Sequence, residues 1–264
     1  MPRISLVDSP AAEAAAIGAV QTGDLQRAGT LYLIRHGRTR GNGQHYVGWE
    51  DLELDATGLT QVDQLGQAMA AVHLDAIYCS PLIRARQTAQ ALIRFGQTPQ
   101  RQQLRPQERP ELMEIHYGEF QGFSKAEHSL RLRRDYTTRR LPGGESLADV
   151  HARVERIAVE LKARLHRGET VAVVAHYRSL QLLRGAIVGE SLEAALTRRD
   201  YKPGNGSILR MQFTIEAGAM HLQLVETLGC ASFDPRIGVA AELEVSPSQS
   251  CAGNQSFLAA PVLA

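Results

Sequence analysis

The sequence is poor in cysteine and has no long apolar run. Its three cysteines in 264 residues, Cys79, Cys230 and Cys251, stand far apart. An odd number at such spacing is typical of neither a disulfide framework nor a zinc site, so we expect a reducing, cytoplasmic location. No segment approaches the roughly 20 apolar residues of a membrane helix, so no membrane association is expected. The alanine-rich stretch 11–20 has acidic neighbours and makes a poor secretory signal.

The chain also lacks a strong excess of charge of either sign. Its 29 basic residues face 28 acidic residues, which gives a formal net charge of +1. A dedicated nucleic-acid-binding protein normally carries a clear basic excess, so we expect small molecules rather than nucleic acid as partners. With 44% hydrophobic residues, the chain is long enough to bury the core of one large α/β domain.

Apolar runs rich in β-branched residues alternate with segments of helical periodicity. The expected strands are 30–34, 76–79, 170–175 and a closing antiparallel pair, 208–213 and 221–225. The expected helices are 57–72, 82–95, 146–167 and 180–188, with C-terminal stops at Gly96, Gly168 and Gly189. This alternation predicts a three-layer α/β/α fold with a mainly parallel central sheet.

The periodicity also divides the chain into regions. Residues 1–29 are expected to form an N-terminal extension, 30–228 the folded domain, and 229–264 a flexible tail. Within the domain, 118–141 is irregular and charged, which predicts an insertion over the edge of the sheet. This insertion holds a cluster of arginines: Arg131, Arg133, Arg134, Arg139 and Arg140.

Three segments repeat one pattern, in which a buried strand is followed by polar residues and then a helix. They are 34–37, 78–84 and 174–178. Because the carboxyl ends of parallel strands lie along one edge of a sheet, His36, Arg84 and His176 can meet there, with Arg35 beside them. Ser80-Pro81 is a favourable helix start and would bring backbone amide donors to the same edge.

Each of these polar residues has an ordinary structural explanation when taken alone. A histidine at a strand end is more often structural than catalytic, and an arginine in the first turn of a helix is more often solvated or ion-paired. However, two histidines and two arginines cannot neutralise one another. A bound anion explains their convergence, and a phosphate ester is the anion that we expect.

The motifs around these residues resemble those of the histidine phosphatase superfamily, also called the phosphoglycerate mutase-like family. The matching motifs are Arg-His-Gly-x-Thr at 35–39, Gly-Trp-Glu-Asp at 48–51, Ser-Pro-Leu-x-Arg at 80–84, the glutamate-rich stretch 111–122, Leu-Pro-Gly-Gly-Glu-Ser at 141–146, His176, and Asn-Gly-Ser-Ile at 205–208. The resemblance covers roughly residues 30–226 and implies the phosphoglycerate mutase-like fold.

The resemblance implies a role for each residue at the strand ends. His36 would be the nucleophile that attacks phosphorus and forms a phosphohistidine, with its other ring nitrogen held by a backbone carbonyl. Arg35, Arg84 and His176 would hold the non-bridging phosphoryl oxygens and stabilise their charge in the transition state. Neither a metal ion nor a cofactor is then expected.

The family's general acid position is occupied by Glu114. A carboxyl group in this role should have a raised pKa, because it has to donate a proton to the leaving alkoxide before it acts as a base toward water. Glu111 and Glu119 are competing candidates, for which a solvated loop or a salt bridge is the favoured explanation. Asn42 and the backbone around Gly48 match positions that contact phosphate or the rest of the substrate.

The chain departs from the family after His176, where small residues are usual. Tyr177 could narrow the pocket or donate its hydroxyl to substrate, and Arg178 could add an anion contact; alternatively, both side chains turn away. Gln181 stands where an arginine is common. Arg38 replaces another family residue and is expected to be exposed.

The arginine cluster lies in the region that caps the active site in relatives. It could bind a carboxylate or a second phosphate of the substrate, or it could form a solvated helix face. The sequence leaves the physiological substrate, the pathway and the oligomeric state open, a homo-oligomer included.

The expected function is hydrolysis of a small phosphorylated metabolite, because the segment 205–208 resembles that of the phosphatase branches. The Gly-Trp-Glu-Asp and Pro-Gly-Gly-Glu-Ser motifs also resemble those of α-ribazole phosphatases and sugar-phosphate phosphatases. A cofactor-dependent phosphoglycerate mutase is the alternative enzyme. A pseudophosphatase that binds phosphorylated ligands without turnover is the alternative if Tyr177 blocks the phosphate.

Overall fold

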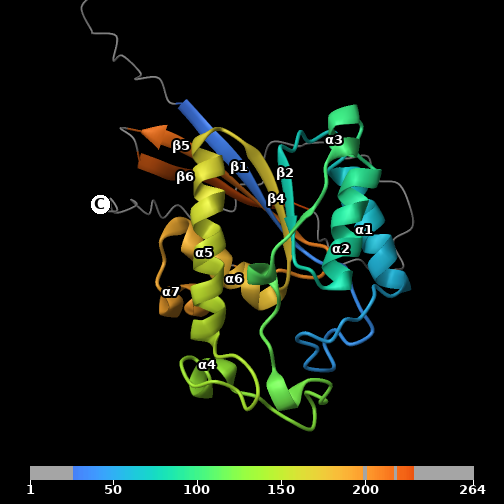
Figure 1. The fold of residues 1–264 in the computed structure, drawn as a ribbon, viewed down its shortest axis with the longest axis vertical. Helices are drawn as coiled ribbons and strands as arrows, with labels where there is room; N and C mark the ends of the chain where they lie inside the picture. The colour runs from blue at the N-terminus through green and yellow to red at the C-terminus, as the bar shows by residue number, and fades with distance from the viewer. Residues whose placement is uncertain (1–25, 199–200, 217–218, 229–264) are drawn as a thin grey trace, which may run out of the picture.

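The computed structural model describes residues 26–198, 201–216 and 219–228, which form a twisted sheet between helical layers (Figure 1). Most of the expected N-terminal extension and all of the expected C-terminal tail lie outside the described residues. The strands are β1 (Gln26–Arg35), β2 (Ala76–Cys79), β3 (Gln107–Glu108), β4 (Thr170–Ala175), β5 (Ile208–Glu216) and β6 (Ala219–Leu228). Their order across the sheet is β3-β2-β4-β1-β5-β6.

The strand directions confirm the mainly parallel sheet with a closing antiparallel pair. β1, β2, β3 and β4 run parallel to one another, whereas β5 pairs antiparallel with both β1 and β6. β1 begins at Gln26, four residues before the expected start at Thr30. The cause is its pairing with the long β5, which continues past a bulge between Arg27 and Gly29. The expected boundary between residues 29 and 30 therefore falls inside a strand.

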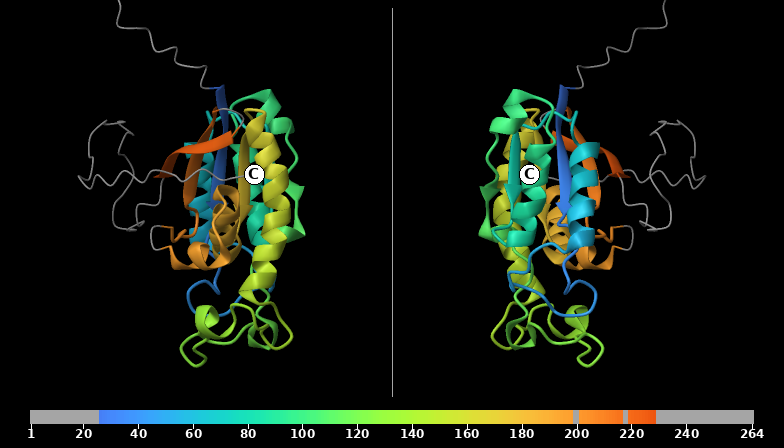
Figure 2. Two further views of the ribbon diagram at one scale, coloured as in Figure 1. Left: turned by 90° about the vertical axis from the view of Figure 1, so that its left-hand side faces the viewer. Right: turned by 90° about the vertical axis from the view of Figure 1, so that its right-hand side faces the viewer.

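Helices cover both faces of the sheet, which confirms the three-layer prediction (Figure 2). The helices are α1 (Ala56–Ala68), α2 (Ile83–Arg94), α3 (Pro99–Gln103), α4 (Leu132–Asp135), α5 (Leu147–His166), α6 (Tyr177–Val188) and α7 (Leu192–Thr197), with 3₁₀ turns η1 (Pro110–Leu112) and η2 (Gly118–Phe120). α3, α4 and α7 were not expected, because helices of one or two turns show no readable periodicity. Among the described helices, none is both long and apolar enough to cross a membrane.

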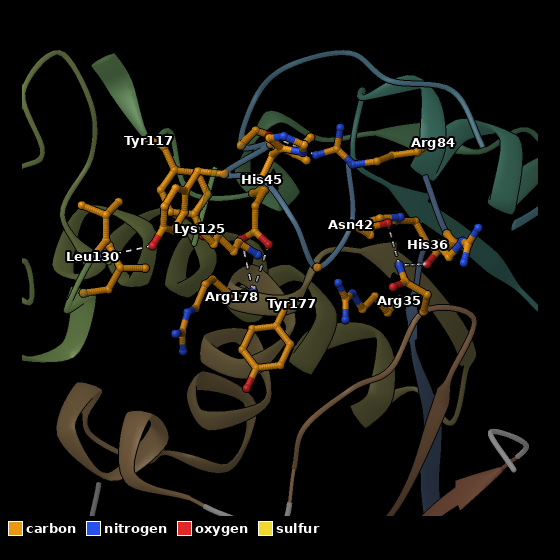
Figure 3. Close-up of a pocket in the computed structure, with 18 residues that line it drawn as sticks. Arg35, His36, Asn42, His45, Arg84, Tyr117, Lys125, Leu130, Tyr177 and Arg178 are labelled. Carbon is orange, nitrogen blue, oxygen red and sulfur yellow. Dashed lines mark hydrogen bonds between the residues drawn. The ribbon is translucent and has the colours of Figure 1, made fainter. Parts of the chain in front are cut away.

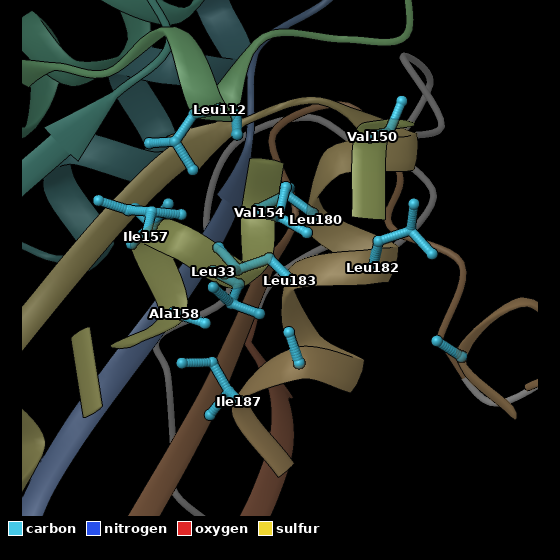
Figure 4. Close-up of a cluster of buried hydrophobic side chains, with 14 of the residues drawn as sticks. Leu33, Leu112, Val150, Val154, Ile157, Ala158, Leu180, Leu182, Leu183 and Ile187 are labelled. Atoms are coloured by element: carbon cyan, nitrogen blue, oxygen red, sulfur yellow. The ribbon is translucent and has the colours of Figure 1, made fainter. Parts of the chain in front are cut away.

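Successive residues of the central strands enter two different cores. Leu33 and Val173 pack with α5 and α6, as Figure 4 shows for Leu33, Val154 and Leu183. Ile34 and Val174, the next residues, pack on the opposite face with α1 and α2. Burial on both faces explains why these strands are continuous apolar runs rather than alternating ones.

Two helix starts differ from the prediction because side-chain hydrogen bonds to the backbone determine them, from a distant residue for α2 and from a local one for α6. α2 begins at Ile83 rather than directly after Ser80-Pro81, and the Ile83 amide donates to Oδ1 of Asp51 at 2.5 Å. The amide donors expected there for an anion are thus partly taken by a carboxylate. α6 begins at Tyr177, three residues before the expected start, because His176 is its N-cap and the His176 amide donates to Oγ of Ser179.

The insertion 118–141 lies beyond the carboxyl ends of the parallel strands, at the bottom of both views in Figure 2. It is joined to the loop after β1 by main-chain contacts. The Lys125 amide donates to the Gln44 carbonyl at 2.8 Å, and the Tyr46 amide donates to the Phe123 carbonyl at 3.1 Å. The insertion and this loop therefore form one wall above the strand ends.

A buried arginine joins the ends of α1 and α2 on the other side of the fold. Arg101 is 2% exposed, and its guanidinium donates to the carbonyls of Val72, after α1, and Leu92, in the last turn of α2. The C-terminal end of a helix carries partial negative charge, which favours a cation there. Gly96, the expected stop of α2, leaves space for this side chain, since a Cβ at Gly96 would lie 2.1 Å from Cγ of Arg101.

Replacing Arg101 by methionine tests this link between the helices. In Arg101→Met both buried carbonyls lose a charged donor, so we expect the free energy of unfolding to fall by about 2–4 kcal/mol. Urea unfolding followed by circular dichroism measures the loss. Arg105→Met is the control, because Arg105 is exposed and contacts only nearby carbonyls. Equally small decreases in the free energy of unfolding of both variants would contradict the role assigned to Arg101.

Candidate active site

The ends of β1, β2 and β4 open into a cavity of about 530 Å³ that residues of the insertion also line (Figure 3). These strands are neighbours in the sheet, as the repeated strand-end pattern requires. The cavity is lined by Arg35, His36, Arg38, Asn42, Gly43, His45, Tyr46, Val47, Gly48, Arg84, Glu114, Tyr117, Lys125, Leu130, Leu132, Tyr177, Arg178 and Asn205. His176 adjoins it, with its ring centroid 4.9 Å from that of His36.

Backbone groups bind the amide, the carbonyl and one ring nitrogen of His36. Its amide donates to the Ala175 carbonyl of β4 at 3.1 Å, and its own carbonyl accepts from the Gly206 amide. Its ring Nδ1 lies 2.6 Å from the carbonyl oxygen of Gly37. A carbonyl only accepts, so Nδ1 carries the proton and Nε2 has the free lone pair that a nucleophile needs.

The environment keeps the His36 imidazole neutral. Its side chain is buried, and burial followed by the positive charges of Arg84 and Arg35 holds its pKa well below 6.5. The hydrogen bond to Gly37 acts in the opposite direction but is outweighed. A neutral imidazole is the form that can attack an electrophile.

His176 presents a proton rather than a lone pair. Its Nδ1 accepts from Nε of Arg84 at 3.3 Å, which leaves the hydrogen on Nε2. Burial and the neighbouring Arg84 hold its pKa well below 6.5 as well. Within the described residues, Nε2 of His176 and Nε of Arg35 are buried and have no hydrogen-bond partner. Two unpaired donors at one cavity are what a bound anion would satisfy.

Arg84 is a charged side chain that is almost fully buried at the edge of the cavity. It is 2% exposed, and burial lowers its pKa to about 10, which still leaves it charged at neutral pH. Its two terminal nitrogens donate at 2.7 Å to the carbonyls of Glu50 and Gly48. Gly48 has φ +52°, and a Cβ there would lie 2.5 Å from Oε1 of Gln121. Glycine thus lets this carbonyl reach Arg84.

Of the three glutamates weighed from the sequence, only Glu114 lines the cavity. Its Oε1 accepts from the amides of Ile115 at 3.0 Å and Arg178 at 3.2 Å. The Arg178 amide belongs to the first turn of α6, so the carboxylate lies at a positive helix end. Glu111 and Glu119 do not line the cavity. Glu119 is exposed, as favoured for it, whereas Oε2 of Glu111 is buried and has no hydrogen-bond partner among the described residues.

Asn42 and Asn205 form a hydrogen-bonded pair in the cavity wall. Oδ1 of Asn42 accepts from the Thr39 amide at 2.8 Å and from Nδ2 of Asn205 at 3.1 Å. Nδ2 of Asn205 also lies 3.1 Å from the His36 carbonyl. The Asn-Gly-Ser-Ile motif alone does not indicate this contact of Asn205, whereas the position of Asn205 just before β5, the neighbour of β1, could have indicated it.

Tyr177 lies between two guanidinium groups. Its ring centroid is 5.6 Å from Cζ of Arg35 and 5.0 Å from Cζ of Arg178. In Figure 3 the Tyr177 hydroxyl is directed away from His36. The Arg178 guanidinium donates to Oε1 of Gln181 at 2.8 Å. The residue that replaces the usual glycine therefore supports Arg35 and does not point at the nucleophile.

The arginine cluster of the insertion does not line the cavity. Arg134 and Arg140 lie beside the carboxylates of Asp135 and Asp149, and Arg139 stacks on Tyr136. The cluster therefore lies on the exposed surface outside the cavity lining, the arrangement expected of a solvated face. Arg38 is exposed as expected and pairs with Asp55.

The insertion instead contributes a lysine that the sequence analysis missed. Lys125 lines the cavity, and burial together with repulsion from Arg35 and Arg178 lowers its pKa, while Glu114 acts in the opposite direction. A single lysine in a charge-rich loop has no periodicity or motif that could have singled it out. Its position depends on the contact between the insertion and the loop after β1.

The two neutral histidines predict a specific pH dependence of stability. Below its ordinary pKa near 6.5, each histidine takes up a proton in the unfolded chain but not in the folded one. The free energy of unfolding should therefore fall by about 1.4 kcal/mol per pH unit and per histidine as the pH drops below 6.5. Urea unfolding between pH 7.5 and 5.5 in phosphate-free buffer measures this slope.

The double variant His36→Asn, His176→Asn should lose that part of the slope. The variant His73→Asn is the control, because the His73 side chain is 69% exposed and lies outside the cavity. If the double variant kept the full slope, groups other than these two histidines would be responsible for the acid sensitivity.

Comparison with known proteins agrees with this geometry. Residues 31–224 match the family model of the histidine phosphatase superfamily (branch 1). A 2,3-bisphosphoglycerate-dependent phosphoglycerate mutase from Rhizobium etli is 34% identical over 168 residues, which cover 59% of this chain and 78% of that relative.

Solved structures with the same fold include phosphatases. A mycobacterial glucosyl-3-phosphoglycerate phosphatase is 27% identical with a TM-score of 0.60, over 75% of this chain and 98% of that chain. An α-ribazole phosphatase from Shigella flexneri is 25% identical with a TM-score of 0.60, over 74% and 95%. The family match spans most of the sequence and includes each strand end described above, and the chain belongs to the histidine phosphatase superfamily.

Proposed function

We propose that this enzyme is a metal-independent phosphomonoesterase that hydrolyses a small phosphorylated metabolite through a phosphohistidine on His36. The observation that carries the proposal is the neutral imidazole of His36, whose Nδ1 is fixed by Gly37 and whose surroundings hold unpaired donors on Arg35 and His176. Nucleophile and anion site thus occupy one cavity, and a carboxyl group, Glu114, lines the same cavity.

In the first step Nε2 of His36 attacks phosphorus in line, and the bond from phosphorus to the leaving oxygen breaks. Glu114 donates its proton to the leaving oxygen. In the second step water attacks the phosphohistidine, Glu114 takes the proton from water, and the P–N bond breaks to release phosphate. Arg35, Arg84 and the Nε2–H of His176 stabilise the charge on the non-bridging oxygens in both transition states.

The remaining cations indicate where the rest of the substrate lies. Lys125 and Arg178 line the cavity as further positive charges. We assign the phosphate end to Asn42 and Gly48, which also line it. Apolar contacts come from Leu130 and other residues of the insertion, which we assign the role of a cap. This mixture of charged and apolar side chains suits a small polar metabolite.

The wide spacing of the three cysteines supports a cytoplasmic location for the reaction.

Hydrolysis and mutase chemistry share the first step and differ in what accepts the phosphoryl group. The named mutases among the relatives favour mutase activity as a second candidate. The Asn-Gly-Ser-Ile segment, which resembles that of phosphatase branches, supports hydrolysis, as do the names of the phosphatases with similar structures. We therefore place hydrolysis first.

An assay of p-nitrophenyl phosphate in EDTA tests the proposal. Wild-type protein should hydrolyse the ester, and His36→Asn should lower kcat/KM by about 10³-fold or more. Incubation with labelled substrate should leave acid-labile, base-stable phosphate on wild-type protein only. Phosphoryl exchange between monophosphoglycerates that requires a bisphosphorylated primer, without net hydrolysis, would identify a mutase instead. Binding of phosphate esters without turnover would identify a pseudophosphatase.

Two variants of Tyr177 test whether this residue supports or obstructs the site. Because the ring stacks on Arg35 and the hydroxyl points away from His36, Tyr177→Phe should keep kcat/KM within about threefold. Tyr177→Gly removes the stacking surface, so kcat/KM should fall by about 3–30-fold. A rise in activity in Tyr177→Gly would show that the tyrosine restricts the phosphate site.

A further inference from the structure

The loop that carries Glu114 has little regular structure of its own. Glu114 lies between the single 3₁₀ turns η1 and η2, and neither turn includes it. A carboxyl group that transfers a proton has to be placed accurately, since a displacement of about 1 Å can reduce a rate by about 10²-fold. Side chains from outside this loop therefore have to fix its backbone.

Arg153 of α5 fixes one side of this loop. Its terminal nitrogens donate to the carbonyl of Glu111 at 2.6 Å and to the carbonyl of Glu114 at 2.9 Å. The Arg153 side chain is 9% exposed. A buried guanidinium bonded to two carbonyls of one loop restrains both their separation and their direction.

Glu145 completes the restraint on the other side of Glu114. Its carboxylate accepts from Nε of Arg153 at 3.0 Å and, through Oε2, from the His116 amide at 2.9 Å. The Glu145 amide in turn donates to the His116 carbonyl at 2.9 Å. The ion pair thus holds the chain both before and after Ile115, the residue next to Glu114.

A third side chain restrains Glu114 from the opposite wall. Nε1 of Trp49 donates to the Glu114 carbonyl at 2.6 Å, so this oxygen accepts from both Trp49 and Arg153. With the main chain fixed, the Glu114 side chain reaches the Arg178 amide and the cavity. Neither Arg153 nor Glu145 lines the cavity, so both act through Glu114.

We propose that Arg153 and Glu145 are positioning residues for the acid–base carboxyl group of Glu114. The inference rests on the proposed function, in which Glu114 protonates the leaving oxygen. Removal of a purely structural ion pair would lower kcat/KM for every substrate to the same extent. Removal of a positioning pair lowers kcat/KM only for those substrates whose leaving oxygen needs a proton from Glu114.

Two phosphate esters with different leaving groups separate these cases. p-Nitrophenolate is a stable anion and leaves with little help from an acid, whereas the alkoxide of ethyl phosphate needs a proton. The parameter to compare is kcat/KM, because it reports formation of the phosphohistidine and excludes its hydrolysis, which both substrates share. Glu114→Gln, measured on both esters, gives the full effect of losing the acid.

In Arg153→Met we expect kcat/KM to fall by about 30-fold or more for ethyl phosphate and by less than about fivefold for p-nitrophenyl phosphate. Glu145→Gln should change the ratio of the two values in the same direction. The control is Arg184→Met, which removes an arginine of α6 that is equally buried and pairs with Glu190. This control should leave the ratio of the two esters unchanged.

Equal losses on both esters in Arg153→Met, or no loss on either, would overturn the proposal. If Arg153→Met does not fold, Arg153→Lys gives the same test, since lysine keeps the charge but lacks the planar fork that reaches two carbonyls. The proposed function fails separately, if Glu114→Gln shows no preference between the esters or if wild-type protein hydrolyses neither.

Discussion

The buried guanidinium of Arg84 is the interaction on which the rest of the site depends. From α2 it binds the carbonyls of Gly48 and Glu50 in the loop after β1, and it donates to His176 at the end of β4. Three segments that are distant in sequence therefore share one almost fully buried cation. Because a buried charge is stable only with such partners, folding itself brings these segments together. The proposed phosphate site is consequently arranged by folding itself.

This arrangement concentrates positive charge around a single carboxylate. Glu114 shares the cavity with four basic side chains: Arg35, Arg84, Lys125 and Arg178. The two histidines are neutral and therefore add no further repulsion between positive charges. A phosphate that enters the cavity brings the missing negative charge and meets donors that are already desolvated. The concentration of positive charge thus favours binding of an anion.

The sequence predicted what depends on periodicity and topology. Parallel strands bring their carboxyl ends together, so the sequence alone places His36, Arg84 and His176 at one edge of the sheet. What it could not predict depends on contacts between distant segments. The start of α2 is determined by Asp51, and Lys125 reaches the cavity only because the insertion pairs with the loop after β1. A linear pattern carries no signal for such contacts.

Main-chain hydrogen bonds join the insertion to the loop after β1, as between Lys125 and Gln44 and between Tyr46 and Phe123. A main-chain hydrogen bond survives most exchanges of the side chain that it belongs to. The insertion can therefore accumulate substitutions at such positions without loosening the loop that holds Arg84, whereas Gln121, whose side chain accepts from the Trp49 amide, is constrained. Substrate preference can diverge in this part of the protein during evolution while the phosphoryl-transfer geometry beneath it is inherited unchanged.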